Sequence, residues 1–227
     1  MKREIIMRMR KKKHLEEKLS KCTNLIDMPP VTEDYREAIK TKEYIDFAKL
    51  FGNHNPLHME IGCGKGQFIA ELASRTPEIN YIAVEVNRNV ICDACKKALE
   101  ADLKNVIFMH CGAEVLPKYI KEGSIERLYL NFSCPFPKNA YENRRLTNVR
   151  FLNIYDLILS SGAEIHQKTD NMHFFEYSLE QYSIAGYKIK NLSLDLHKSG
   201  FEGNIITEYE QRFSSMGYPI YRVEAYR

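Results

Sequence analysis

Two kinds of hydrophobic segment alternate along the chain from residue 57 onward, and this alternation constrains the fold more than any other feature of the sequence. Segments rich in β-branched and aromatic residues predict strands, and segments with helical apolar spacing predict amphipathic helices. Strands are expected at 57–61, 80–86, 105–111, 125–132 and 163–170. Strands and helices that alternate are typical of β-α-β units, so the sequence predicts an α/β fold with a largely parallel sheet.

The helices expected between and after these strands cover 65–75, 90–99, 151–159 and 172–185. Residues 187–197 follow, and a last helix and strand are expected within 207–217 and 218–227. The part before residue 57 has only a loose helical pattern. We therefore divide the chain into a basic arm (1–21), an extension that packs on the core (22–56) and one domain (57–227).

The basic arm carries nine Lys or Arg residues against three Glu residues within 1–21, whereas the whole chain has a net charge of only +3. Flexible Lys and Arg side chains bind nucleic-acid phosphates by releasing condensed counterions. The arm is therefore either a phosphate clamp or a solvated terminus. The sequence leaves open whether translation starts at Met1 or Met7, and whether the protein is a monomer or a homodimer.

Several classes of protein are not expected from the composition. No segment approaches the about 18 consecutive apolar residues of a membrane span, and the arm leads into acidic residues rather than an apolar secretion segment. Six cysteines in 227 residues do not make a dense disulfide framework, which favours thiols in the cytoplasm. Cys92 and Cys95 form one CxxC pair without a second pair, and their helical spacing predicts core side chains. No metal site and no membrane partner are therefore expected.

A glycine-rich loop, Gly62-Cys63-Gly64-Lys65-Gly66, joins the first expected strand to the first expected helix. A dinucleotide fingerprint requires G-x-G-x-x-G, and Gln67 stands where its third glycine belongs. Glu60, at the strand end, would meet an ammonium or sulfonium group better than a phosphate. Glu85, at the end of the next strand, is placed to accept hydrogen bonds from ribose hydroxyls. This set favours S-adenosylmethionine over a nicotinamide cofactor and over a turn that binds nothing.

Further motifs follow the glycine loop in order: HMEIGCGKGQF, YIAVE, YLNFSCPFPK, NRRL, HQKTDN, EYSL, SLDLH and EGNIITEYE. With these motifs the chain resembles the tRNA (guanine-N7)-methyltransferase family from Met7 to nearly its last residue. The resemblance implies a class I methyltransferase fold, which is Rossmann-like with a seven-stranded, mostly parallel sheet, over residues 57–227. It also implies methyl transfer from S-adenosylmethionine to N7 of a guanine in the tRNA variable loop.

The resemblance assigns roles to individual residues as well. The positions expected to bind S-adenosylmethionine are Glu60, Gly62, Gly64, Glu85, Gly112 and Asn131. The positions implied to bind the tRNA substrate are Lys138, Asp170, Thr207, Glu208, Tyr209 and Glu210, and Arg144 and Arg145 lie in a segment implied to contact RNA.

Three residues depart from the family pattern, and one of them is Phe136, which stands where relatives carry a tryptophan. Cys134 stands where relatives carry an aspartate implied to be catalytic, and Gly112 where they carry an acidic cofactor-binding residue. Guanine N7 has a free lone pair and no proton to lose, so its methylation needs orientation rather than a general base. A carboxylate beside the base would stabilise the positive charge that develops on the purine, and its loss costs on the order of 10² to 10³ in rate. We expect a slower enzyme; the alternative is a homologue that binds tRNA without catalysis.

Other roles compete with those that the resemblance implies. Cys134 as a covalent nucleophile is not expected, because nothing in the sequence indicates an activated thiolate. Thr207 and Glu210 have the spacing of a capping box, which favours helix capping, although capping and substrate contact can coexist. Without the resemblance, a solvated loop face would be an equally good interpretation of Lys138, Arg144 and Arg145. The basic charge of this loop and of the arm favours a nucleic-acid substrate over a small molecule.

Overall fold

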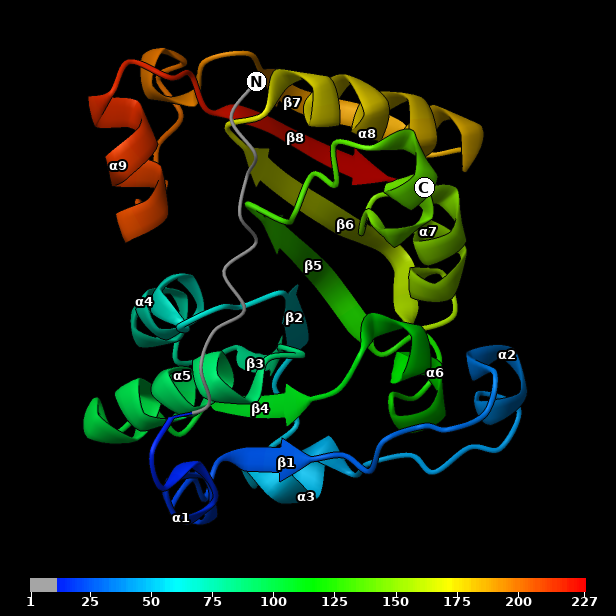
Figure 1. Cartoon of the computed structure of the whole chain (residues 1–227), viewed down its shortest axis with the longest axis vertical. Helices are drawn as coiled ribbons and strands as arrows, with labels where there is room; N and C mark the ends of the chain where they lie inside the picture. Colours follow the sequence, from blue (N-terminus) through cyan, green and yellow to red (C-terminus); the bar gives the residue numbers. More distant parts are fainter. Residues whose placement is uncertain (1–11) are drawn as a thin grey trace.

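The computed structural model describes residues 12–227, so residues 1–11, which hold part of the basic arm, lie outside the described chain. The described residues form a central sheet of eight strands in the order β1-β4-β3-β2-β5-β6-β8-β7 (Figure 1). Pairs from β1 to β6 in this order are parallel, and β8 runs antiparallel to both β6 and β7. The predicted α/β fold with a mostly parallel sheet is confirmed.

The strands predicted from residue 57 onward are present within a few residues of their expected bounds. They are β2 (Leu57–Ile61), β3 (Asn80–Val84), β4 (Val106–His110), β5 (Ile125–Asn131), β6 (Leu159–Thr169) and β8 (Tyr221–Tyr226). Residues 187–197, to which no element was assigned from the sequence, contain β7 (Lys188–Ser193). The sheet has one strand more than the seven expected, because β1 (Leu25–Asp27) pairs with β4. A three-residue strand is too short to show a period in the sequence, so it was not predicted.

The described helices are α1 (Leu15–Ser20), α2 (Tyr35–Ala38), α3 (Phe47–Phe51), α4 (Gln67–Arg75), α5 (Arg88–Glu100), α6 (Leu116–Tyr119), α7 (Val149–Tyr155), α8 (Met172–Ile184) and α9 (Glu208–Ser215), with short 3-10 helices η1 (Ala113–Val115), η2 (Asn139–Arg144) and η3 (Leu196–Lys198). The helix predicted over 151–159 was too long at its end. It stops at Tyr155 because the Ile158 carbonyl accepts a hydrogen bond from Ile125 N at 3.0 Å, and β6 begins at Leu159.

The central strands contribute side chains to two hydrophobic cores, one on each face of the sheet. In β3, Tyr81 and Ala83 pack with residues of α4 and α5, whereas Ile82 and Val84 pack with residues of α6, α7 and α8. This alternation is the two-residue period of a strand. The thiols of α5 lie in the first core, so the prediction that Cys92 and Cys95 are core side chains is confirmed.

The segments before residue 57 attach to both cores. Leu15 and Leu19 of α1 belong to the core that contains α5, and Phe47 of α3 belongs to the other. The Lys12 amide donates to Asn89 Oδ1 at 2.9 Å. The first described residue therefore lies next to the start of α5. A search of the described helices for one long and apolar enough to cross a bilayer found none. Because β2 to β6 are parallel, their carboxyl ends share the edge where α4 and α5 begin.

Candidate functional site

The glycine loop connects β2 to α4 at this edge. Gly62, Gly64 and Gly66 all have positive φ angles, of 78°, 56° and 71°. An L-residue rarely adopts this conformation. At Gly66 a side chain is also excluded by space, because a Cβ would lie 2.7 Å from Ala94 Cβ of α5. The sequence therefore needs glycine here both to turn the backbone and to bring α4 against α5.

Glu60 is the penultimate residue of β2, and its side chain lies inside the protein. It is 2% exposed, and its Oε1 accepts a hydrogen bond from Asn131 Nδ2 at 3.0 Å. Its Oε2 is buried without a hydrogen-bond partner in the described structure. Burial raises the pKa of Glu60 to about 7, while the Asn131 hydrogen bond and the charge of Lys168 oppose the rise. A buried acceptor without a donor indicates that a ligand supplies the donor.

Glu85 follows β3 and holds the loop from the other side. Its Oε2 accepts a hydrogen bond from Gly64 N at 3.1 Å, and its Oε1 accepts one from Asn87 N at 2.9 Å. The carboxylate thus joins the glycine loop to the start of α5. Glu60, Glu85 and Asn131 come from three neighbouring strands, which is the convergence expected of a ligand site at the carboxyl edge of a parallel sheet.

A cleft of about 490 Å³ lies in front of the glycine loop and is closed on one side by α9. The expected site residues that line it are Glu60, Gly62, Gly64, Asn131, Thr207, Glu208 and Tyr209. Gln67 joins its walls, because its Oε1 accepts a hydrogen bond from Glu208 N at 2.6 Å. A cleft of about 590 Å³ at the opposite sheet edge is lined mainly by residues 44–57 and contains none of the expected residues.

The N-terminus of α9 is capped as the sequence predicted, but only half of the capping box forms. Thr207 Oγ1 accepts a hydrogen bond from Glu210 N at 3.1 Å. The Glu210 side chain does not return to Thr207; it is fully buried, and its Oε2 accepts from Lys168 Nζ at 2.7 Å. Lys168 Nζ also donates to Ile205 O and Asn204 Oδ1. Glu210 was expected at the substrate, but its burial makes it an internal anchor for α9.

The loop after β5 carries Cys134 beside α9. Phe132 begins this loop with a positive φ of 51°, and its amide donates to Lys168 O at 2.8 Å. The Phe132 ring lies 5.0 Å from the Tyr209 ring, between centroids. Cys134 is exposed, and its thiol is close enough to affect the pKa of Tyr209. Asp170 interacts with the Tyr209 hydroxyl, and burial raises the pKa of Asp170. The loop after β5, the end of β6 and helix α9 therefore meet at Tyr209.

The two arginines expected at the RNA have different environments. Arg145 is buried, and its guanidinium donates to Pro135 O at 2.9 Å and Phe136 O at 3.0 Å while stacking on Tyr177. It holds the Cys134 loop from behind instead of presenting its charge to a partner. Arg144 is exposed, with its guanidinium 4.6 Å from the Phe136 ring, and Lys138 is exposed as well. Arg144 and Lys138 can therefore meet a phosphate, whereas Arg145 positions the loop.

Gly112 follows β4 with an ordinary φ of −78°, so no backbone strain requires glycine there. A Cβ at this position would lie 2.8 Å from Glu114 Oε2. The Glu114 carboxylate thus stands in the space that a side chain of residue 112 would enter. Its partner is Arg150, at 3.3 Å. An acidic group is present near Gly112 after all, from a residue that the sequence reasoning missed because it lies two positions later.

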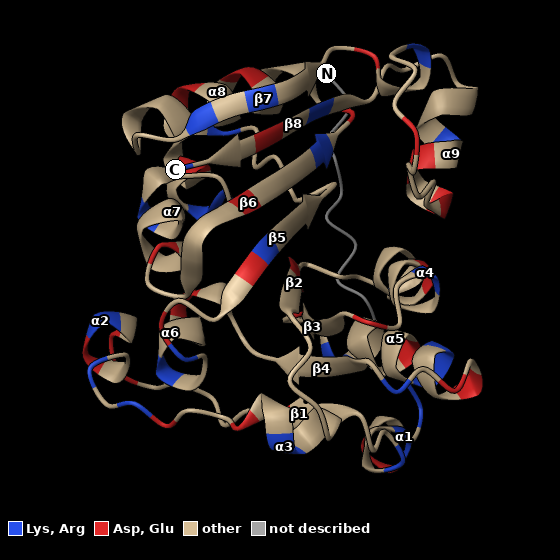
Figure 2. Cartoon of the chain, turned by 180° about the vertical axis from the view of Figure 1, so that it is seen from behind, with Lys and Arg blue, Asp and Glu red and all other residues tan. Residues whose placement is uncertain are grey.

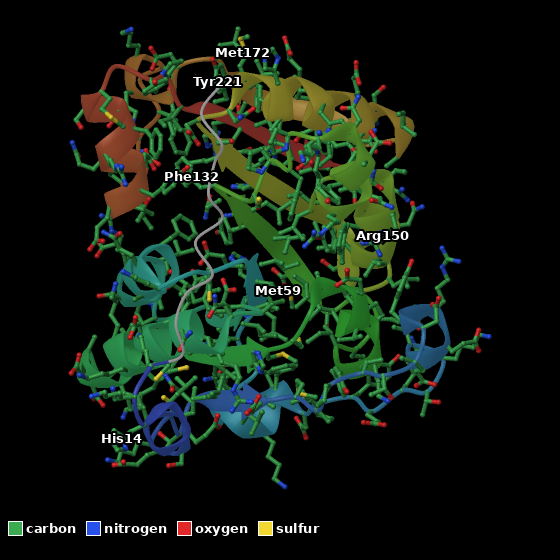
Figure 3. The ribbon with its side chains drawn as sticks, in the orientation of Figure 1. His14, Met59, Phe132, Arg150, Met172 and Tyr221 are labelled. Carbon is green, nitrogen blue, oxygen red and sulfur yellow. The ribbon has the colours of Figure 1, made fainter. Side chains whose placement is uncertain are left out.

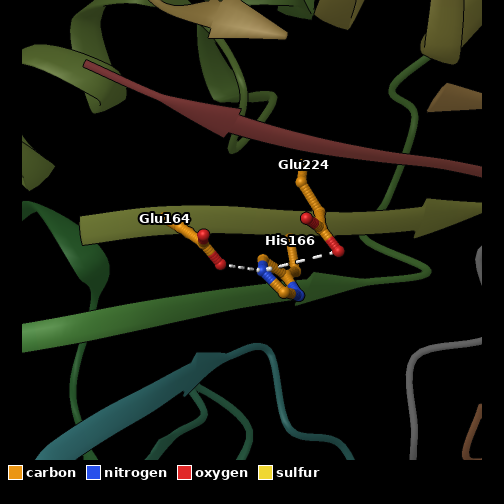
Figure 4. Close-up of side chains that lie close together, drawn as sticks. All are labelled: Glu164, His166 and Glu224. Atoms are coloured by element: carbon orange, nitrogen blue, oxygen red, sulfur yellow. Dashed lines mark hydrogen bonds and ion pairs between the residues drawn. The ribbon is translucent and has the colours of Figure 1, made fainter. Parts of the chain in front are cut away.

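Glu164, His166 and Glu224 form the one group of metal-ligand type found among residues 12–227, with ligand atoms within 4.8 Å of one another (Figure 4). The cluster lies on β6 and β8, and Figure 2 shows acidic and basic residues along both strands. Arg127 and Lys190 pair with Glu164, and Arg222 pairs with Glu224. Burial opposes ionisation of Glu164, but the Lys190 and His166 hydrogen bonds and the Arg127 charge lower its pKa to about 2. Side-chain cations already balance these carboxylates.

The site includes residues that the sequence motifs did not single out. Lys168, Gln67 and Phe132 join segments that are far apart in the chain. Lys168 and Glu210 are separated by 42 positions. Only the pairing of β6 with the last segment of the chain brings such residues together. Lys168, the lysine within HQKTDN, was the best indication in the sequence that such a contact exists. A lysine next to a strand end at the ligand edge needs an acidic partner if it is buried.

The comparisons with known sequences agree with this architecture. A family model described as "Putative methyltransferase" matches residues 54–223. The tRNA (guanine-N(7)-)-methyltransferase of Listeria welshimeri is 50% identical over 177 residues, which are 78% of this chain and 83% of that protein. The protein of the same name from Streptococcus thermophilus is 43% identical over 219 residues, which are 96% of this chain and 98% of that protein.

Solved structures extend the comparison to the fold. "Structure of an Antibiotic Related Methyltransferase" matches with a TM-score of 0.59 and 18% identity over 87% of this chain and 95% of that one. The 16S rRNA methyltransferase KamB matches with a TM-score of 0.57 and 18% identity over 81% and 94%. These neighbours show the class I methyltransferase fold. With the sequence relatives, they establish that the chain belongs to the tRNA (guanine-N7)-methyltransferase family.

Proposed function

We propose that this protein transfers a methyl group from S-adenosylmethionine to N7 of a guanine in the variable loop of tRNA. The observation that carries the proposal is the buried, unpartnered Glu60 Oε2 at the wall of the cleft. A carboxylate in this position selects a cationic ligand with a donor, which the methionine ammonium of the cofactor provides. Family membership supplies the rest of the assignment.

The residues of the cleft fit the cofactor. Glu60 and Asn131 would hold its methionine end, and the glycine loop allows close approach because Gly62 and Gly64 have no side chains. Glu85 would accept from the ribose hydroxyls while it holds the loop through Gly64. When bound, the cofactor supplies an electrophilic methyl group on a positively charged sulfur.

The guanine N7 lone pair would take up the methyl group, and the electron pair of the broken C–S bond would stay with sulfur. Positive charge would thereby move to the purine, and no proton would be transferred. Tyr209 lines the cleft from α9, and Asp170, which follows β6, interacts with the Tyr209 hydroxyl. Asp170 would accept from the guanine N1–H and amino group, which orients N7 and places negative charge near the base.

The tRNA would approach from the edge that carries the exposed cations. Arg144 and Lys138 lie on the loop after β5, and Lys12, the first described residue, lies beside Asn89 at the start of α5. The described part of the basic arm therefore begins near the cleft, because Val90 next to Asn89 lines the cleft. A cytoplasmic location is part of the proposal, because all six cysteines are free thiols.

Methyl transfer from radiolabelled S-adenosylmethionine to an unmodified tRNA transcript tests the proposal, with the labelled base mapped by chemical cleavage at 7-methylguanine. We expect label at a variable-loop guanine. Binding of tRNA without label would instead support the homologue that has lost catalysis. Label on a free purine nucleoside but not on tRNA would support a small-molecule methyltransferase.

Cys134→Asp separates the effect of the missing carboxylate from the rest of the site. If charge beside the base limits the reaction, this variant should raise the single-turnover rate by on the order of 10² with unchanged cofactor affinity. Cys134→Ser is the matched control, because it changes the side chain without adding charge. Equal rates for all three proteins would refute the charge argument.

A further inference from the structure

Helix α9 presents aromatic side chains to solvent although it lies beside the reaction cleft. Its one buried residue is Glu210, whereas Tyr209 is 46% exposed and Phe213 is half-buried. A surface helix normally turns its apolar face to the core. In α9 the position that faces inward is an acid paired with Lys168, and the aromatic residues belong to neither hydrophobic core.

The aromatic side chains form a continuous row that starts in the cleft. The ring centroids are 5.0 Å apart between Phe132 and Tyr209, 4.5 Å between Tyr209 and Phe213, and 5.9 Å between Phe213 and Tyr218. Figure 3 shows Phe132 beyond the end of β5, between α9 and α4. At the far end, Tyr218 is 54% exposed. We name Phe132, Tyr209, Phe213 and Tyr218 the aromatic row.

We propose that the aromatic row is a stacking surface for the unpaired bases next to the methylated guanine. The proposal rests on the proposed function, since it takes tRNA as the substrate. The row begins at the wall of the cleft where the guanine would react and leads away from it along α9. A base adjacent to the target would therefore meet Phe213 or Tyr218 once the target base lies at Tyr209.

The chemistry of the row suits single-stranded RNA. Proteins read unpaired loops by splaying the bases and stacking them on aromatic side chains, each stack contributing about 1–3 kcal/mol. Arg212 lies in the same helix with its guanidinium 5.9 Å from the Phe213 ring, where it can meet the phosphate of a stacked nucleotide. Arg144 stands over Phe136 on the facing loop. Cations beside aromatic rings match a polyanion with exposed bases better than an apolar protein segment.

The test combines ring removal in the protein with base removal in the RNA. Phe213→Leu and Tyr218→Leu keep apolar volume but remove the ring, and Tyr44→Leu is the control because Tyr44 is 43% exposed at the opposite sheet edge. Affinity is measured for the intact tRNA and for tRNAs with an abasic nucleotide on either side of the target guanine. Cofactor affinity is measured for every protein.

We expect each row variant to lose at least about fivefold in affinity for intact tRNA, and less than about twofold for the abasic tRNA that lacks its partner base. Tyr44→Leu should lose nothing, and cofactor affinity should not change. Equal losses on intact and abasic tRNA, or no loss at all, would overturn the stacking role. If the parent protein does not methylate tRNA, the proposed function fails instead, which the methylation assay detects separately.

Discussion

Replacing Glu60 by glutamine tests the electrostatics of the cleft. Burial raises the pKa of Glu60 to about 7, so about half of the free protein carries a proton on this side chain at pH 7. A bound cation requires the ionised form, and the proton must leave. Affinity for S-adenosylmethionine should therefore fall as the pH drops through 7, by a factor of 1 + 10^(7−pH) relative to high pH.

The expected change is large enough to measure. Affinity should be roughly fivefold lower at pH 6.0 than at pH 7.0, a range in which the ligand's amino group, with a typical pKa of about 7.7–8.0, stays mostly charged. His58 and His166 do not interfere, because burial lowers the pKa of each to about 4. At pH 7 each binding event should release about 0.5 proton into the buffer.

Isothermal titration calorimetry in buffers of different ionisation enthalpy measures both quantities. Glu60→Gln should bind more weakly at pH 7.5, release no proton and lose the pH dependence. Glu85→Gln is the matched control, because it weakens binding while leaving Glu60 in place; burial, rather than the Glu85 charge, is the main cause of the raised pKa of Glu60, so most of the dependence should persist. The reasoning is refuted if the parent binds equally at both pH values, or if Glu60→Gln keeps the dependence.

Other predictions concern the anchor of α9, the sheet face and the arm. Lys168→Met removes the cation paired with the buried Glu210 carboxylate, which keeps only His197 and Asn204 as neighbours, and should lower the free energy of unfolding by about 3–5 kcal/mol in urea denaturation. Lys168→Met combined with Glu210→Leu should recover much of this loss. Burial lowers the pKa of His166 to about 4 in the folded protein, whereas the unfolded chain takes up this proton below about pH 6.5, so the free energy of unfolding falls between pH 7 and pH 5. In calorimetry, His166→Gln should reduce this fall by about 2 kcal/mol. An unchanged fall would contradict the lowered pKa. Deletion of residues 1–11, which contain five Lys or Arg residues, should reduce the slope of log K against log salt for tRNA by up to about four units, and an identical slope would mean that the arm does not contact phosphate.

The sequence predicted those parts of the site that follow from strand order. Glu60 and Glu85 each end a strand of regular hydrophobic pattern, and parallel strands bring such ends to one edge, so their proximity to the glycine loop needed no tertiary information. Thr207 was predicted as a helix cap by its local spacing alone. Local patterns were sufficient wherever the interacting groups are close in the chain or related by neighbouring strands.

The remaining features depend on contacts that no local pattern records. Glu210 has the spacing of a capping-box acid, but a buried lysine from β6 attracts its carboxylate more strongly than the helix end does. Arg145 follows an exposed arginine in a charged loop, yet carbonyls of the returning chain and the Tyr177 ring enclose it. β1 is recognised only by the strand that it pairs with. Each case required knowledge of which distant segment lies next to the residue.

The Lys168–Glu210 ion pair also determines how easily α9 can leave the body of the protein. An apolar contact is lost at full cost when water replaces it, but separated ions regain hydration, so part of the interaction is returned on opening. The helix carries its own cap at Thr207 and contributes no side chain to either hydrophobic core. Its attachment therefore depends on this ion pair, on the Gln67–Glu208 hydrogen bond and on the Phe132–Tyr209 contact. The amides of α9 should exchange with solvent before those of β2 or β5.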